Sequence, residues 1–312
     1  MKLIIQLPCY NEESALPITL AELPRVVEGF DEVEWLVVDD GSTDNTVKVA
    51  KAEGVNHIVE LGGNRGLARA FIAGLDRCLL ERADVIVNID ADNQYCAQDI
   101  PKLTNPILEG RAEYVIGERP IDEIDHFPRS KRILQKIGSS VVRKVSGVTV
   151  RDAPSGFRAL SRNCASQLNV FNSYTYTLET LIQAGQSSIS VISVPIRVNP
   201  DLRPSRLVRS AADYVTRSIF TIVRIFVVYQ PFKFFFLIGL FLLLLGVILG
   251  VRFLYFFLTG EGGGHIQSVI LSGVFLGIGF QTILVAFVAD LISVNRKLLE
   301  EICTLHREKN RK

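Results

Sequence analysis

The sequence has almost no net charge, no closely spaced pair of cysteines and a single tryptophan. Its 34 basic and 33 acidic side chains leave a charge of +1 over 312 residues. Nucleic-acid-binding proteins normally carry a clear basic surplus, so this balance argues against that class of function and predicts no nucleic-acid partner. The five cysteines show no CxxC spacing, which indicates reduced thiols facing a cytosol. The first apolar run ends at Pro8 and is too short for a signal peptide.

Two long uncharged apolar runs lie near the C-terminal end instead. No charged residue occurs within 234–251 or 266–289, and runs of about 20 such residues cross a bilayer as helices. The glycine-rich segment 259–265 between them predicts a tight hairpin. We therefore expect a transmembrane hairpin over 232–312, with spans at about 232–258 and 266–290. Basic side chains flank both outer ends, so the positive-inside rule places the N-terminal region and the basic tail in the cytoplasm.

The segment 201–231 before the hairpin combines arginines with apolar residues at helical spacing. This pattern predicts an amphipathic helix at the membrane interface, with an ordinary surface helix as the alternative. A second basic amphipathic stretch covers 131–145, and the same two interpretations are open for it. Three glycines of the second span favour close helix packing, from which we expect a homo-oligomer: Gly273, Gly277 and Gly279.

The first 200 residues alternate short β-branched runs with helical patterns such as 44–53 and 66–80. This alternation predicts an α/β domain with a Rossmann-like, mostly parallel sheet. Ligands of such domains gather beyond the carboxyl ends of the strands. The predicted strands are 2–7, 34–39, 57–61, 84–89, 113–116 and 189–198.

Acidic residues follow three of these strands. Glu12 comes after the first, Asp39 and Asp40 after the second, and Asp90 and Asp92 after the fourth. Carboxylates brought to one edge repel each other unless a cation compensates their charge. The DxD pattern suits a hard divalent ion whose remaining ligands are diphosphate oxygens and water. Each motif alone is equally compatible with a solvated turn or a helix N-cap.

Six motifs together resemble glycosyltransferase family 2, and most closely its dolichyl-phosphate mannose synthase group. They are PCYNE (8–12), VVDDGSTDNT (37–46), NRGLARA (64–70), DAD (90–92), GER (117–119) and SGFRA (155–159). The resemblance implies a cytoplasmic GT-A type catalytic domain over 1–200. It also implies transfer of one sugar, with inversion, from a nucleotide diphosphate sugar to a polyisoprenyl phosphate. The pocket residues fit a uridine or a guanosine diphosphate, and uridine is favoured because the two-span hairpin resembles the bacterial branch.

The resemblance also implies roles for the donor-side residues. Asp40 would accept a hydrogen bond from the base, Asp90 would hold the sugar or ribose, and Asp92 would bind Mg²⁺ or Mn²⁺ with Asp90 as a second ligand. Asn93 stands where many relatives carry a hydrophobic residue. The full nucleotide-sugar set is Pro8, Tyr10, Glu12, Asp40, Arg65, Gly66, Asp90 and Gln94. An arginine at position 65 is equally compatible with ordinary surface charge.

The acceptor side is expected to combine a carboxylate with arginines. Asp152 either acts as a base, orients the acceptor or has a structural role, and Glu179 is the rival acid; with Asp90 and Asp92, Asp152 completes the expected catalytic set. A phosphate monoester is largely ionised at pH 7, which reduces the need for a base. Arginine matches the geometry of phosphate, although Arg158 could instead form a structural ion pair. The candidates are Arg119, Arg129, Arg158 and Arg206.

Three other functions compete with this one. A processive polysaccharide synthase of the same fold usually carries a QxxRW motif and more spans, whereas the sole tryptophan here is Trp35. A non-catalytic scaffold that binds nucleotide sugar or lipid predicts a damaged DxD motif, and both aspartates are present. A channel or transporter subunit has only the hairpin in its favour.

Overall fold

The computed structural model describes residues 1–120, 139–140, 143–170, 176–200, 220, 223–224, 227–260 and 262–309. The chain divides into two compact units, Met1–Ile219 with Glu301–Lys312, and Phe220–Glu300. Most of the two expected amphipathic segments, 131–145 and 201–231, lies outside the described residues, as do Arg129 and Arg206.

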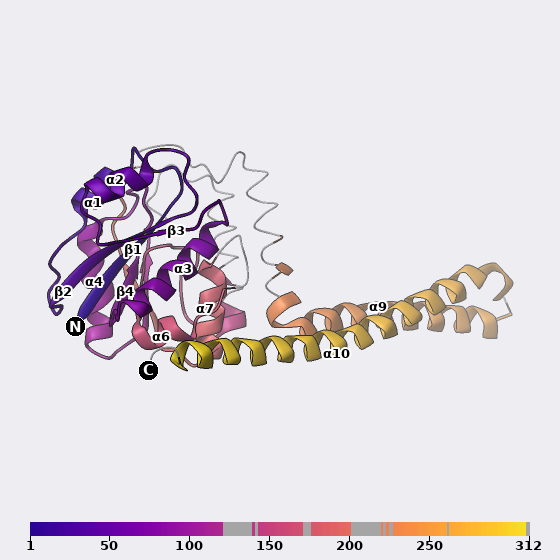
Figure 1. Ribbon diagram of the computed structural model, residues 1–312. Coiled ribbons are helices and arrows are strands. Elements are labelled where there is room, and N and C mark those ends of the chain that lie inside the picture. The colour runs from indigo at the N-terminus through magenta and orange to yellow at the C-terminus, as the bar shows by residue number, and fades with distance from the viewer. Residues whose placement is uncertain are drawn as a thin grey trace. The chain divides into compact units, whose positions relative to one another are not determined.

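The described part of the first unit contains a seven-stranded sheet of order β3-β2-β1-β4-β6-β5-β7. Figure 1 labels the first four strands of this order. Strands β3, β2, β1 and β4 are parallel neighbours, and β5 is parallel to β7. Only β6 runs antiparallel, against both β4 and β5. The predicted mostly parallel sheet is confirmed, and β6 is a strand that the sequence pattern did not predict. The strands are β1 (Lys2–Cys9), β2 (Glu32–Asp39), β3 (His57–Glu60), β4 (Val85–Asn88), β5 (Tyr114–Glu118), β6 (Arg158–Ser161) and β7 (Val191–Pro195).

Helices connect these strands and cover both faces of the sheet. Strand β1 is buried over seven of its eight residues, as expected for a central strand covered on both sides. The helices are α1 (Leu16–Glu22), α2 (Thr46–Ala52), α3 (Leu67–Leu80), the 3₁₀ turn η1 (Ala97–Asp99), α4 (Ile100–Leu108), α6 (Arg162–Gln167) and α7 (Thr177–Gln186).

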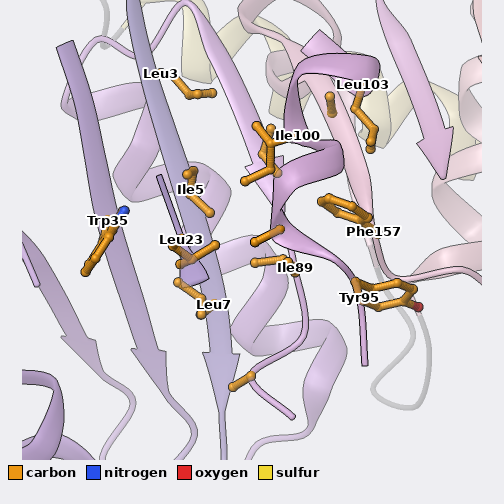
Figure 2. Packing of buried hydrophobic residues seen from close by; sticks show 14 of the residues in the cluster. Leu3, Ile5, Leu7, Leu23, Trp35, Ile89, Tyr95, Ile100, Leu103 and Phe157 are labelled. Atoms are coloured by element: carbon orange, nitrogen blue, oxygen red, sulfur yellow. The ribbon is translucent and has the colours of Figure 1, made fainter. Parts of the chain in front are cut away.

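Alternate residues of β1 enter two different apolar layers. Leu3, Ile5 and Leu7 belong to one buried cluster with side chains of α1 and α4, including Leu20 and Leu103 (Figure 2). On the other face, α3 packs so closely that a Cβ at Gly74 would lie 2.5 Å from Gln6 Oε1. Full burial of each such leucine or isoleucine contributes roughly 1.5–3 kcal/mol. The central strands therefore form a rigid base for the loops at their carboxyl ends.

The second unit is a helical hairpin. Its helices are α9 (Pro231–Leu258) and α10 (Ile266–Lys309), joined through the 3₁₀ turn η2 (Gly262–His265). The segments Pro231–Leu258 and Gly263–Arg296 are long enough to cross a bilayer, and each contains an 18-residue stretch of high mean hydropathy, 3.0 in the first and 2.2 in the second. The two predicted apolar helices are thus present. The second continues as one helix well beyond 290.

Small residues bring the two hairpin helices into close contact. A Cβ at Gly239 would lie 2.9 Å from the carbonyl oxygen of Gly279. Ser272 Oγ also donates a hydrogen bond of 2.7 Å to Gly246 O. Gly279 therefore serves packing within the chain. At Gly273 and Gly277, by contrast, an added Cβ would meet no described atom within 4 Å outside the helix itself.

Candidate active site

The loops after β1 and β2 hold each other in place. The backbone N–H of Asn11 donates to Ser42 Oγ at 2.9 Å, and the N–H of Thr43 donates to Asn11 Oδ1 at 2.8 Å. The N–H of Glu12 donates to Thr46 Oγ1 at 2.8 Å. Side chains of the DGSTDNT motif thus fix the PCYNE loop, which carries the expected donor residues Pro8, Tyr10 and Glu12. Of these three, Tyr10 is exposed and Pro8 is buried.

The same turn after β2 fixes a third loop. Both carboxylate oxygens of Asp40 accept backbone N–H groups, from Arg65 at 2.7 Å and from Gly66 at 2.8 Å. Gly41 has φ +77°, and a Cβ there would lie 2.5 Å from Gly63 Cα. The two backbones therefore touch, which only glycine permits at this position. The structure brings Asp40, Arg65 and Gly66 together, with Asp40 as the group that ties the loops.

The DAD motif directly follows β4. Asp90 is half-buried, and a Cβ at Gly156 would lie 2.5 Å from its Oδ2. Burial, reinforced by the charge of Asp92, raises the pKa of Asp90 to about 7. Beyond it, the N–H of Gln94 donates to Asp92 Oδ1 at 3.3 Å.

The residues of this motif fit a divalent cation only in part. A cation would relieve the repulsion between the Asp90 and Asp92 carboxylates, and hard cations prefer such oxygen ligands. However, the described residues contain no group of three or more His, Cys, Asp or Glu side chains that could hold a metal. Among the described residues, this motif therefore offers two carboxylates to a cation, whose remaining coordination positions would be filled by a ligand or water.

The acceptor candidates Arg119 and Asp152 form a buried ion pair. Arg119 follows the end of β5, and its Nε and Nη2 donate to the two oxygens of Asp152 at 2.7 and 3.0 Å. Asp152 is fully buried, whereas 16% of the Arg119 side chain is exposed. Burial favours the neutral form of Arg119, but the neighbouring Tyr95 and Asp152 outweigh it, so that its pKa is raised. The arginine is thus a fixed, partly accessible cation.

Arg158 has a different environment from the one expected. It is fully buried, and its guanidinium donates to the carbonyl oxygens of Ala153, Ser155 and Thr177 and to the hydroxyls of Tyr114 and Thr180. No described carboxylate forms an ion pair with it. The prediction that Arg158 binds the acceptor phosphate, and the alternative of a structural ion pair, are both wrong for this structure, because protein oxygens already occupy the buried guanidinium.

Glu179, the rival acid, lies in the first turn of α7 and is buried. Asn93, the departure from the family pattern, has φ +58° and donates to Glu22 Oε1 at 3.2 Å. Its side chain therefore contacts α1, and its Oδ1 also accepts a hydrogen bond from Asn199 Nδ2 at 3.4 Å.

Sequence reasoning missed a polar network below the DAD motif. Asn88 Nδ2 donates to Gly156 O at 2.8 Å and to Tyr176 OH at 2.9 Å, and Gln6 Nε2 donates to Asn88 Oδ1 at 2.9 Å. The N–H of Gly156 donates to Tyr95 OH, also at 2.9 Å. The signal in the sequence was Asn88, an amide side chain at the end of an otherwise apolar strand. A buried polar group of this kind indicates hydrogen-bond partners nearby.

Comparison with known proteins identifies the family of this chain. Residues 4–168 match the profile of the family described as Glycosyl transferase family 2. The chain belongs to this family. It is therefore a glycosyltransferase, and both the resemblance drawn from the motifs and the GT-A-like fold are confirmed.

Several curated relatives act on lipid phosphates. The chain is 28% identical over 204 residues to the polyprenol monophosphomannose synthase of Mycolicibacterium smegmatis, covering 62% of this chain and 76% of the relative. It is 30% identical over 207 residues to the undecaprenyl-phosphate mannosyltransferase of Micrococcus luteus, covering 63% and 83%. A third relative is the UDP-N-acetylglucosamine–dolichyl-phosphate N-acetylglucosaminyltransferase of Methanococcus voltae, with 29% identity over 212 residues, 61% of this chain and 83% of the relative.

Among solved structures, glucosyl-3-phosphoglycerate synthase from Mycobacterium tuberculosis has the same fold. The TM-score is 0.53 at 22% identity, and the match covers 71% of this chain and 79% of the other. That crystal structure contains Mn²⁺, uridine diphosphate and glucosyl-3-phosphoglycerate.

Proposed function

We propose that this glycosyltransferase moves a single sugar from a nucleotide diphosphate sugar to a polyisoprenyl phosphate at the cytoplasmic face of a membrane. The observation that carries the proposal is the Arg119–Asp152 pair, in which a buried carboxylate fixes a partly accessible arginine. Asp90 and Arg119 also interact electrostatically, so the donor-side and acceptor-side groups are neighbours. The curated relatives named for transfer to polyprenyl and dolichyl phosphates support the same acceptor class.

The donor binds across the loops that follow β1, β2 and β4. The PCYNE loop and the DDG turn are already tied together, so the pocket needs little ordering when the nucleotide enters, which favours binding. Asp40 retains lone pairs beyond the two backbone hydrogen bonds and can still accept from a base N–H. Uridine remains the favoured nucleoside, and a protein of the same fold binds uridine diphosphate.

Asp92 and Asp90 would hold Mg²⁺ or Mn²⁺ together with diphosphate oxygens. When bound, the ion stabilises negative charge on the leaving nucleoside diphosphate. The protein's own part is to keep both carboxylates at the end of a buried strand. The pKa of Asp90, raised to about 7 by burial and by Asp92, makes this site responsive to pH because proton and cation compete for the same oxygens.

Arg119 grips the acceptor phosphate, and Asp152 holds Arg119 in the orientation for that contact. Both oxygens of Asp152 already accept from the guanidinium, which favours the orienting role over the base role. A phosphate monoester is largely anionic at pH 7 and does not require a base. Glu179 is buried in α7 and is the weaker candidate for catalysis.

The reaction is a single in-line displacement. An acceptor phosphate oxygen forms the new bond to the anomeric carbon, while the bond from that carbon to the diphosphate oxygen breaks. The nucleoside diphosphate leaves with the electron pair, and the configuration at the anomeric carbon inverts. The hairpin anchors the catalytic domain where a lipid-linked acceptor is concentrated.

The test is a reconstituted reaction. Full-length protein in lipid nanodiscs is incubated with undecaprenyl or dolichyl phosphate, Mg²⁺ or Mn²⁺, and UDP-glucose, UDP-N-acetylglucosamine or GDP-mannose. Mass spectrometry should detect a monoglycosylated lipid phosphate with one of these donors and none after chelation. Repeated sugar addition would favour the polysaccharide synthase, and bound donor without any product would favour the non-catalytic scaffold.

A further inference from the structure

The turn that carries Asp152 and Gly156 is held from its buried side. Arg158 Nη2 donates to Ala153 O and Nε to Ser155 O, each at 2.6 Å. Its remaining donors reach Thr177 O at 2.9 Å and the hydroxyls of Thr180 and Tyr114. The guanidinium of Arg158 thus links two carbonyl groups of the turn to α7 and β5 through hydrogen bonds. A planar fork with donors on three nitrogens can do this, whereas a lysine ammonium cannot.

The peptide groups of Gly156 are fixed separately on both sides. Its N–H donates to Tyr95 OH, and its carbonyl oxygen accepts from Asn88 Nδ2. Tyr95 lies against Phe157, with ring centroids 5.3 Å apart (Figure 2). Asn88 precedes Asp90 in the chain and Tyr95 follows it, and together they hold the two peptide groups of Gly156.

The contacts of Asn88 and Tyr95 with Gly156 set the position of the Asp90 carboxylate. Strands β4 and β6 pair in antiparallel register with Asn88 opposite Arg158, and two residues further on Asp90 comes opposite Gly156. The carboxylate contacts Gly156 so closely that no Cβ fits between them. The start of the same turn holds Asp152 against Arg119. One turn thus contacts both the donor-side carboxylate and the acceptor-side ion pair.

We propose that Arg158 and Tyr95 are positioning residues, which hold the turn from Asp152 to Phe157 so that Gly156 backs Asp90 while Asp152 orients Arg119. This inference rests on the proposed function, because it assigns the two ends of the turn to donor and acceptor. Neither residue needs to touch a substrate. Displacing the turn changes the position of Asp90 relative to Arg119 without altering the nucleotide loops after β1 and β2.

The test compares Arg158→Lys and Tyr95→Phe with wild type in nanodiscs, using the nucleotide sugar that gives turnover and undecaprenyl phosphate. Because a shift of about 1 Å can cost up to 100-fold in rate, kcat should fall about 10- to 100-fold, while KM for the nucleotide sugar stays nearly constant. Arg162→Lys is the matched control, since Arg162 donates to the carbonyl oxygens of Ala83 and Leu79 at the other end of β6. Its kcat should stay close to wild type.

Hydrogen exchange provides a readout that needs no turnover. Exchange within 152–157 should accelerate in both variants and stay unchanged in Arg162→Lys, with peptides of β1 and β2 as internal references. Tyr95→Phe keeps the aromatic packing, so it tests the idea even where Arg158→Lys fails to fold. Unchanged kcat in Tyr95→Phe, equal losses in Arg162→Lys, or unchanged exchange in the turn would overturn the proposal. A wild type without turnover, but with the expected exchange pattern, would instead refute the proposed function alone.

Discussion

Replacing Arg119 by methionine separates the structural cost of the Arg119–Asp152 pair from its role in the reaction. Asp152 is fully buried and both of its oxygens accept from Arg119. Removing the arginine leaves a buried carboxylate without its cation, which typically costs about 3–5 kcal/mol of unfolding free energy. For a domain of this size each kcal/mol lowers Tm by about 2–4 °C, so the expected drop is about 6–20 °C.

The double variant Arg119→Met with Asp152→Leu tests that cause. It removes both charges, so most of the lost stability should return, because an apolar pair of similar volume does not leave a buried charge. Thermal unfolding followed by intrinsic fluorescence measures the three proteins side by side. If the double variant is as unstable as Arg119→Met, the unpaired carboxylate is not the source of the loss and the reasoning is refuted.

Activity of the same variants tests the acceptor role. Both should lose turnover with undecaprenyl phosphate while retaining nucleotide binding, because the cation for the acceptor is gone in each. The matched control is Arg197→Met, since Arg197 also pairs with a fully buried carboxylate, Asp99, at 2.7 Å. Asp99 keeps Lys102 at 3.0 Å, so this variant should lose less stability and retain turnover. Full turnover in Arg119→Met would exclude it as the phosphate-binding group.

Other parts of the chain give further expected outcomes. Asp92→Ala should abolish metal-dependent turnover while membrane insertion persists; full activity in chelator would contradict the metal role. Because a proton on Asp90 competes with the cation, Mn²⁺ affinity measured by electron paramagnetic resonance should fall as pH drops below about 7. Deleting 232–312 should leave a domain that binds donor in calorimetry but turns over long-chain lipid poorly, and unchanged lipid turnover would show that the hairpin is only an anchor. Gly273→Leu and Gly277→Leu should weaken a homo-oligomer in light scattering, and a strictly monomeric wild type would refute that expectation.

The sequence was sufficient to predict the parallel strands and the acidic motifs at their ends, because these signals are local. Each acidic motif directly follows a buried β-branched run, and parallel strands necessarily bring their carboxyl ends to one edge. Asp40 and Asp90 could therefore be assigned to the same edge of the sheet before any coordinates. The two apolar helices were equally predictable, since the bilayer dictates their length and composition.

The acceptor side depends on contacts that no spacing reveals. Arg119 and Asp152 are 33 residues apart in sequence, and the strand that joins their surroundings, β6, has only four residues. So short a strand carries little periodicity, and its antiparallel direction interrupts the βα alternation. The prediction for Arg158 failed for this reason, because a motif arginine looks the same in sequence whether its guanidinium faces a ligand or the carbonyls of its own turn.

Arg119 and Arg158 are the same residue type in different environments, and the fold gives them different roles. Arg158 is fully buried, and all three of its guanidinium nitrogens donate to carbonyls or hydroxyls of the protein. Arg119 follows the carboxyl end of β5 and pairs with one carboxylate, and its side chain stays partly accessible. Arg158 begins β6 two residues after Gly156, inside the domain, and its donors are used to fix the backbone. In the proposed function, the cation that binds the acceptor and the cation that holds the turn are therefore different residues. Lysine should fail at both positions for different reasons, because it loses the bidentate contact at Arg119 and the three-way anchor at Arg158.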